Sequence, residues 1–100
     1  MKRLMIALMT MLLLTLSATA LADTLRVGME CNYAPYNWTQ AEPGEHTVPL
    51  SAGGYADGYD VQVARYLAEK LGMELEIVKT EWDGLIPALT SGAGKIDAII

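Results

Sequence analysis

The order of hydrophobic patterns in residues 59–100 constrains the fold of this chain more than any other feature. The apolar residues of the first part recur at three- and four-residue spacings: Val61, Ala64, Leu67, Ala68 and Leu71. This spacing predicts a helix with one buried face. We expect Asp60 to cap the start of the helix and Gly72 to follow its end.

The patterns on either side of that helix predict strands and a second helix. Residues 73–79 alternate apolar and polar side chains, as a half-buried strand does. Residues 84–90 have apolar positions on one side and Pro87 near the start, which is compatible with a short helix that ends at Gly92 and Gly94. Apolar runs at 24–29 and 96–100 complete a strand–helix–strand–helix–strand order. The predicted class is α/β, with parallel strands and right-handed crossovers.

The first 22 residues have the features of an export signal rather than of the folded domain. Lys2 and Arg3 give a positive start, residues 4–16 an apolar middle, and residues 20–22 a small-residue cleavage site. We therefore expect cleavage between Ala22 and Asp23; a retained membrane anchor is the alternative. No cysteine stands at the cleavage point, so we expect a soluble periplasmic or secreted protein rather than a lipoprotein.

Charge and composition exclude several functions. Without Lys2 and Arg3, five basic residues face twelve acidic ones, a net charge of −7, so nucleic acid is not an expected partner. Cys31 is the only cysteine and cannot form a disulfide within the chain; we interpret it as a small, partly buried loop residue. His46 is alone in a polar segment, so neither a metal site nor a cofactor is expected.

Residues 23–100 are few for an independent domain and end on a strand. A domain of this size buries only roughly 60–65% of the surface of its unfolded chain. We therefore expect a truncated N-terminal part of a larger fold. Residues 37–58 are rich in Gly, Pro, Ser and Thr, and we expect them to form a surface loop with at most a short hairpin.

Ligands of open parallel sheets bind beyond the carboxyl ends of the strands. The first predicted strand is followed there by Glu30, Tyr33 and Tyr36, and the second by Trp82 and Asp83. Each has a simpler interpretation: a solvated carboxylate, a packed aromatic ring, or a hydrophobic contact at a helix entry. A tryptophan could instead stack on an aliphatic or cationic ligand, an attraction of about 0.5–2 kcal/mol in the cationic case.

The segments ECNYAPYN (30–37) and GYDVQ (58–62) resemble signatures of the bacterial extracellular solute-binding proteins of family 3, which supply polar amino acids to ABC importers. The resemblance runs from about Leu25 to Ile100 and implies the start of lobe 1 of a two-lobed periplasmic-binding-protein-like fold. It implies that Glu30, Tyr33 and Trp82 face the ligand, and it favours packing of Tyr36 beneath the loop. Tyr36 and Asp83 are further candidate ligand contacts. Gln62 departs from the family pattern, which has an acid there.

The function implied by this resemblance is non-catalytic: capture of a polar amino acid, with a basic one among the options, for membrane ABC permease subunits by a protein that is monomeric at full length. The groups that clamp the α-carboxylate and α-ammonium would lie beyond residue 100. A second hypothesis is a periplasmic cyclohexadienyl or arogenate dehydratase on the same fold, with Glu30 as acid or base. A third is the extracellular sensor domain of a receptor.

Overall fold

The structure, a computed structural model, describes residues 1–17 and 23–100, with side chains described for 1–9 and 23–100. Helix α1 (Lys2–Ser17) covers most of the predicted export signal. Ala22 lies outside the described residues, so the cleavage site stays a prediction. Within the described residues, no helix has the length and apolar character needed to cross a membrane.

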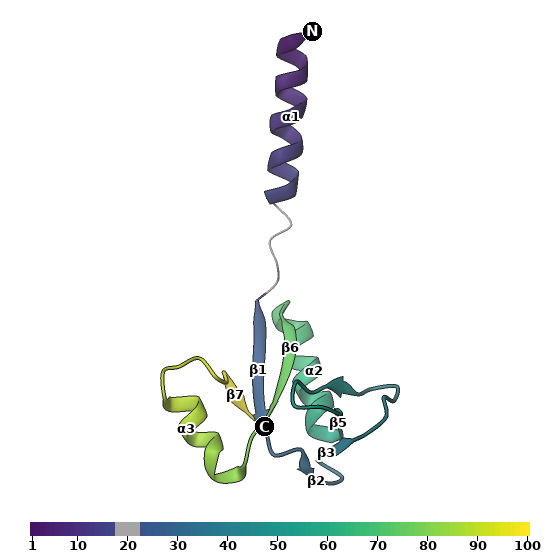
Figure 1. Cartoon of the computed structure of the whole chain (residues 1–100), viewed down its shortest axis with the longest axis vertical. Coiled ribbons are helices and arrows are strands. Elements are labelled where there is room, and N and C mark those ends of the chain that lie inside the picture. The colour runs from purple at the N-terminus through teal and green to yellow at the C-terminus, as the bar shows by residue number, and fades with distance from the viewer. Residues whose placement is uncertain (18–22) are drawn as a thin grey trace.

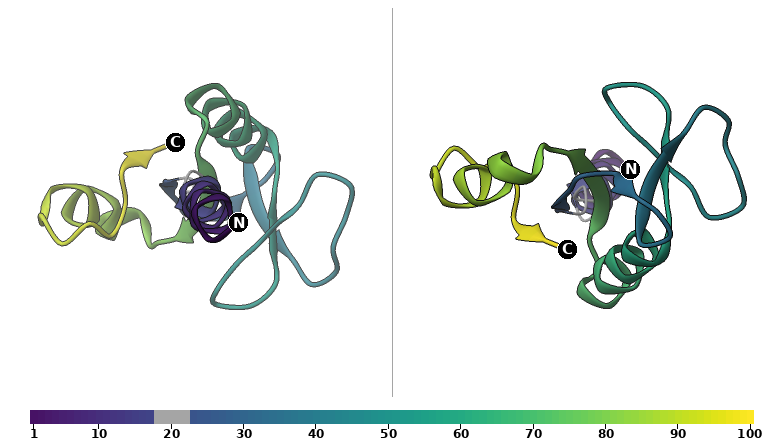
Figure 2. Two further views of the ribbon diagram at one scale, coloured as in Figure 1. Left: turned by 90° about the horizontal axis from the view of Figure 1, so that it is seen from above. Right: turned by 90° about the horizontal axis from the view of Figure 1, so that it is seen from below.

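A three-stranded parallel sheet forms the centre of the fold (Figure 1). Its strands are β1 (Thr24–Met29), β6 (Glu74–Lys79) and β7 (Ala98–Ile99), in the order β6-β1-β7. Helix α2 (Tyr59–Leu71) precedes β6, and α3 (Leu85–Thr90) precedes β7. Figure 2 shows the two helices on opposite faces of this sheet. The predicted βαβαβ order and the α/β class are confirmed.

Strand β1 separates two packing layers because its side chains alternate between the faces of the sheet. Leu25, Val27 and Met29 point into the main core, where they pack with buried residues of α2 and β6. Gly28 faces the other way, toward Leu85 and Ile96. A Cβ atom at Gly28 would lie 2.7 Å from Ile96 Cδ1 and 3.1 Å from Leu85 Cδ2, so the missing side chain lets the α3 layer approach the strand.

The segment between β1 and α2 is more ordered than the sequence predicts. It forms a four-stranded antiparallel sheet of β2 (Asn32–Tyr33), β3 (Asn37–Gln40), β4 (Val48–Pro49) and β5 (Tyr55–Asp57), in the order β2-β3-β5-β4. The expectation of a surface loop with a short hairpin over 37–58 is therefore corrected. The strands are only two to four residues long, too short for apolar alternation to reveal them, yet Val48, Leu50 and Ala56 enter the main core.

Side chains of α2 hold the connection between β3 and β4. Gln62 Nε2 donates to the carbonyl oxygen of His46 at 3.0 Å. Arg65 donates to the same oxygen at 3.0 Å and to the Thr47 carbonyl at 3.2 Å. Gln62, which departs from the family pattern, thus has a structural role that a carboxylate could not fill, because an ionised carboxylate has no proton to donate.

The start of α2 differs from the prediction. The cap residue is Gly58, not Asp60, which lies in the first helical turn. The φ of Gly58 is 120°, and a Cβ atom there would lie 2.5 Å from the Tyr36 carbonyl oxygen, so the close chain crossing requires glycine. Asp60 instead accepts a 2.8 Å hydrogen bond from Asn37 Nδ2, which ties the helix to β3.

The other helix boundaries agree with the sequence. Gly72 ends α2 in the left-handed conformation, with φ of 66°, as predicted. The predicted second helix begins with a 3₁₀ turn, η1 (Trp82–Gly84), and continues as α3, with Pro87 in its first turn. Gly92 follows its end with φ of 70°.

Candidate ligand-binding site

The three parallel strands end at the same edge of the sheet. Met29 is paired with Lys79, and Gly28 with Ile99. The strands remain joined at this edge, where Thr80 N donates to the Met29 carbonyl oxygen at 3.0 Å. Because β1 is central and the chain crosses from it first to β6 and then to β7, the edge is a topological switch point, the place where open α/β sheets bind ligands.

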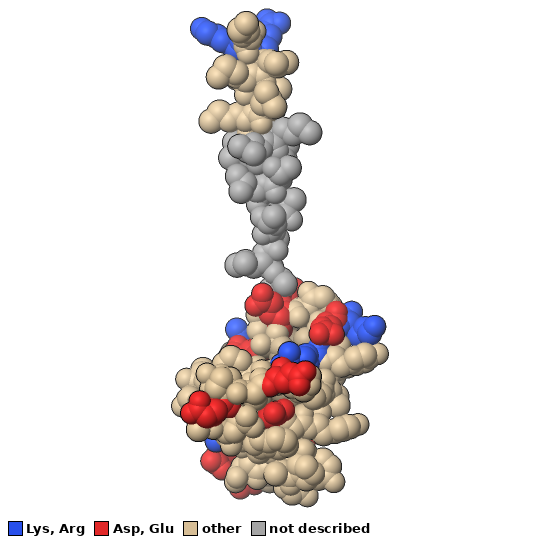
Figure 3. All heavy atoms as spheres, turned by 90° about the vertical axis from the view of Figure 1, so that its right-hand side faces the viewer, with Lys and Arg blue, Asp and Glu red and all other residues tan. Residues whose placement is uncertain are grey.

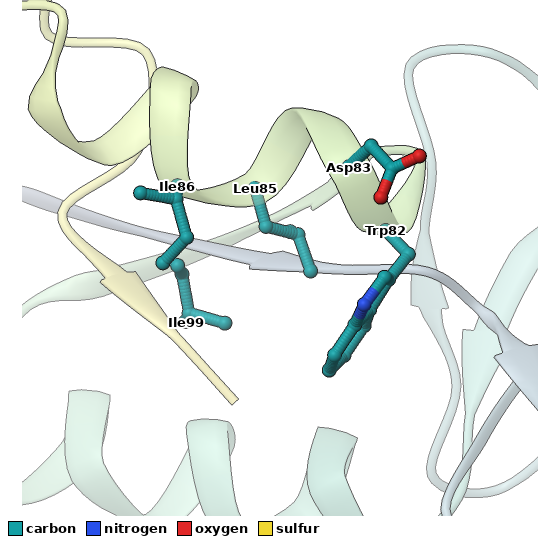
Figure 4. Close-up of a pocket in the computed structure, with 5 residues that line it drawn as sticks. All are labelled: Trp82, Asp83, Leu85, Ile86 and Ile99. Carbon is teal, nitrogen blue, oxygen red and sulfur yellow. The ribbon is translucent and has the colours of Figure 1, made fainter.

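An apolar hollow of about 270 Å³ lies at this edge (Figure 4). It is lined by Trp82, Asp83, Leu85, Ile86 and Ile99. In Figure 4, Trp82 and Asp83 lie at one end, Ile86 and Ile99 at the other, and Leu85 between them. The Trp82 side chain is 69% exposed and that of Ile86 63%, whereas Leu85 is buried beneath them. Exposed apolar side chains around a hollow are the usual composition of a surface that binds an apolar group.

A second hollow, also of about 270 Å³, is polar. Its lining residues are Glu30 and Asn32 after β1, and Lys79, Thr80 and Glu81 at the end of β6. Residues 79–81 line this hollow, and the next two residues, Trp82 and Asp83, line the apolar one. The short segment 79–83 therefore contributes to the lining of both hollows.

The loop after β1 presents two aromatic rings. The Tyr33 and Tyr36 rings lie 5.3 Å apart between centroids, at an interplanar angle of 33°. Tyr33 is 60% exposed and Tyr36 is 48% exposed. Tyr36 therefore contacts Tyr33 and is about half exposed, and its expected packing beneath the loop stays a prediction.

Cys31 anchors the same loop from below. It adopts a positive φ of 56°, and its side chain is buried in the main core. Burial raises the pKa of the Cys31 thiol to about 11, while the Lys79 charge lowers it by a smaller amount. The thiol is therefore neutral and packs as a small apolar group, more deeply buried than the sequence suggests.

The predicted site residues fall into three groups. Trp82 and Asp83 line the apolar hollow, Glu30 lines the polar one, and Tyr33 and Tyr36 stack together in the intervening loop without lining either hollow. Sequence reasoning missed Lys79, Asn32 and Ile99. Lys79 and Ile99 are the last residues of their strands, so the rule that ligands bind at carboxyl ends could have indicated both.

On one face of the molecule, acidic and basic side chains are mixed. On the face shown in Figure 3, acidic side chains are spread over the α/β body with basic ones between them. The longest-range ion pair among the described residues joins Arg26 Nε to Glu76 Oε2 at 3.1 Å, across the neighbouring strands β1 and β6. Both side chains are 45% exposed, so this pair contributes little to stability.

Comparison with known proteins identifies the family. Residues 25–100 match the family described as bacterial extracellular solute-binding proteins, family 3. The match covers more than half of the chain, and the two signatures described above lie within it. This chain therefore belongs to the bacterial extracellular solute-binding proteins of family 3.

Individual relatives agree with that assignment. The chain is 40% identical over 76 residues to a protein named probable histidine-binding protein from Campylobacter jejuni, covering 76% of this chain and 24% of the relative. It also matches the structure of the L-cystine solute receptor of Neisseria gonorrhoeae in its unliganded open conformation. That match has a TM-score of 0.53 and 35% identity, and covers 71% of this chain and 25% of the receptor.

An enzyme is also among the similar proteins. The chain is 39% identical over 65 residues to a cyclohexadienyl dehydratase of Pseudomonas aeruginosa, covering 65% of this chain and 20% of the enzyme. The chain spans about a quarter of the length of the curated relatives that it matches.

Proposed function

We propose that this protein captures an amino acid outside the cytoplasmic membrane and delivers it to an ABC importer. Residues 25–100 would be the first part of one ligand-binding lobe. The observation that carries the proposal is the edge where β1, β6 and β7 end in register, with the exposed Trp82 indole over an apolar hollow and Glu30 in the polar hollow. Family membership supports a solute as the ligand.

Each group at this edge has a chemical task in the proposal. Trp82 stacks on the aliphatic or cationic part of the ligand side chain, and Leu85 supports the hollow from below. Glu30 accepts hydrogen bonds from the polar end of the same side chain. Tyr33 covers the ligand from the β1 loop, and Tyr36 holds its ring in place by stacking. Asp83 is a further polar contact at the end of the apolar hollow.

The proposal places the mature protein in the periplasm or the extracellular space. Residues 1–22 direct export, and cleavage between Ala22 and Asp23 releases a soluble chain that works as a monomer with membrane permease subunits. The groups that bind the α-carboxylate and α-ammonium of the ligand belong to parts of the protein outside residues 1–100. No covalent chemistry is required of Glu30, Tyr33 or Trp82.

A thermal-shift screen of the complete mature protein tests this proposal. The panel contains the twenty amino acids together with cystine and ornithine. A ligand at a hundred times its Kd stabilises the native state by about 2.7 kcal/mol, which gives a clear rise in Tm. We expect a rise with one chemical group of amino acids. A panel without any rise would contradict the proposal.

A second candidate function is a dehydratase that acts on a cyclic carboxylic acid. The observation that favours it is the 39% identity over 65 residues to a cyclohexadienyl dehydratase. In that case Glu30, in its hollow at the end of β1, would act as general acid or base. Turnover of prephenate and arogenate by the complete protein, and by its Glu30→Gln variant, tests this candidate. Activity at the background level for the parent protein would eliminate it.

A further inference from the structure

Lys79 stands out as a charged residue of the polar hollow that the proposed function does not yet use. It is the last residue of β6, paired with Met29, and lines the hollow together with Glu30 and Glu81. The hollow is therefore lined by one basic and two acidic residues. This arrangement is more specific than a simple acidic pocket for a basic side chain.

The ammonium group of Lys79 is held in place without being neutralised. Lys79 Nζ donates to Thr39 Oγ1 at 3.1 Å, and that hydroxyl in turn donates to the Cys31 carbonyl oxygen at 2.9 Å. Among the described residues, which include every acidic side chain of the sequence, no carboxylate lies within ion-pair distance of Lys79. The cation thus has a fixed position and keeps donor capacity for another group.

A ligand that enters the hollow meets both signs of charge. A purely cationic end would find Glu30 and Glu81 but would also lie near the Lys79 ammonium, and a purely anionic end would find Lys79 but would also face both carboxylates. An end that carries both an ammonium and a carboxylate has a partner for each group, so neither is left unpaired when water is displaced. Asn32 and Thr80 add neutral hydrogen-bonding groups to the same wall.

We propose that the polar hollow selects an amino acid whose side chain ends in a second ammonium–carboxylate pair, with Lys79 binding the distal carboxylate and Glu30 the distal ammonium. The apolar middle of such a ligand lies against Trp82, because the segment 79–83 contributes to the lining of both hollows. This inference rests on the proposed function and names the substrate class of its site. Lys79 acts here as a residue that determines specificity.

Calorimetric titration of the complete mature protein with cystine, arginine and glutamine tests the inference. Cystine has a zwitterionic distal end, arginine a cationic one and glutamine a neutral one. In Lys79→Met we expect cystine affinity to fall about 10- to 100-fold, the loss of one charge-assisted hydrogen bond, and the other affinities to change less than about threefold. Lys79→Arg, which keeps the cation, is expected to restore most of the cystine affinity.

Two control variants separate ligand binding from a structural role. Thr39→Val removes the partner of Lys79 in the fold but leaves the cation, and we expect it to keep the preference for cystine. Lys70→Met removes an exposed lysine on α2, whose Nζ lies 5.4 Å from the Tyr66 ring centroid, and we expect no change in binding. If Thr39→Val loses the preference for cystine as fully as Lys79→Met does, the hydrogen bond between Lys79 and Thr39 only positions β3, and the inference is wrong.

The remaining outcomes are also decisive. Equal losses for all three ligands in Lys79→Met, or no loss of cystine binding, would overturn the role of Lys79. A parent protein that binds arginine or glutamine but not cystine would overturn the inference and leave the proposed function standing. A parent protein that binds none of the panel used in the thermal-shift screen would overturn both.

Discussion

The parallel sheet and the antiparallel sheet of this protein are held by different kinds of interaction. Strands β1 and β6 pair over six residues and bury Val27, Met29 and Ile77 almost completely. The antiparallel strands are two to four residues long. They depend on the close approach of Gly58 to the Tyr36 backbone and on hydrogen bonds donated by side chains of α2. One region is specified by burial, and the other by backbone geometry and polar contacts.

The two regions nevertheless share one core. Leu50 and Ala56 from the antiparallel side join the same buried cluster as Val27 and Val61 from the parallel side. A substitution that destabilises either sheet should therefore lower the stability of the whole lobe, but through a different mechanism in each sheet. Substitutions at matched positions can distinguish the two mechanisms.

Replacing the glycine at the crossing should have the largest effect. We expect Gly58→Ala to lower the free energy of unfolding by more than about 3 kcal/mol, because φ of 120° with ψ of 178° is strained for alanine and the added Cβ would meet the Tyr36 carbonyl oxygen at 2.5 Å. Urea unfolding of the complete mature protein, followed by far-ultraviolet circular dichroism, measures the loss.

Gly72→Ala, at the other end of the same helix, is the matched control. Gly72 also has a positive φ, of 66°, but no atom lies within 4 Å of its added Cβ. We expect a loss of about 1 kcal/mol from the backbone conformation alone. Equal losses at the two glycines would show that the close crossing at Gly58 is unimportant.

Removing a core side chain of the parallel sheet should have the next largest effect. Met29 is fully buried, and Met29→Ala is expected to cost about 3 kcal/mol through lost burial and the cavity left behind. The same urea titration measures it, with Leu71→Ala as control, because Leu71 is 61% exposed. A loss at Met29 no greater than that at Leu71 would contradict the view that burial specifies this region.

The difference between the two sheets also explains what could be predicted from the sequence. The spacing of apolar residues predicted the second strand and both helices, because each is a local pattern with a period. The helix end at Gly72 was predicted from the glycine itself. The antiparallel sheet has no such period. Its strands are short, and its contacts join residues far apart in sequence, such as Gln62 and His46 or Asn37 and Asp60.

The same reasoning applies to the site. Glu30 follows β1 directly and Trp82 comes three residues after the end of β6, so the sequence alone indicates that both lie near the carboxyl ends of strands. The contact between the Tyr33 and Tyr36 rings could not be predicted, because it depends on how the loop between them folds. Lys79 was missed because a lysine at a strand end is usually interpreted as a solvated charge, although its position at the carboxyl end of β6 could have indicated it.

Substitution of Trp82 tests whether the edge where β1, β6 and β7 end serves ligand binding rather than stability. We expect Trp82→Ala to weaken amino acid binding by about 1–3 kcal/mol, while the free energy of unfolding changes by less than about 0.5 kcal/mol, since the indole is 69% exposed. Calorimetry and urea unfolding measure the two quantities. Tyr66→Ala, on α2 and 59% exposed, is the control and should leave binding unchanged. Unchanged affinity in Trp82→Ala would remove this side chain from the site.

The smallest expected effect concerns the polar contacts that hold the antiparallel side. Gln62→Glu should lower the free energy of unfolding by about 0.5–1 kcal/mol, because a carboxylate cannot donate to the His46 carbonyl oxygen and repels it. Hydrogen exchange should show the change locally, as faster exchange in residues 41–50 with β1 and β6 unaffected. Gln62→Met, which removes the donor without adding charge, should give a similar but smaller effect. Faster exchange spread evenly over both sheets would mean that the two regions unfold as one unit, and that the polar contacts of α2 do not stabilise the antiparallel side separately.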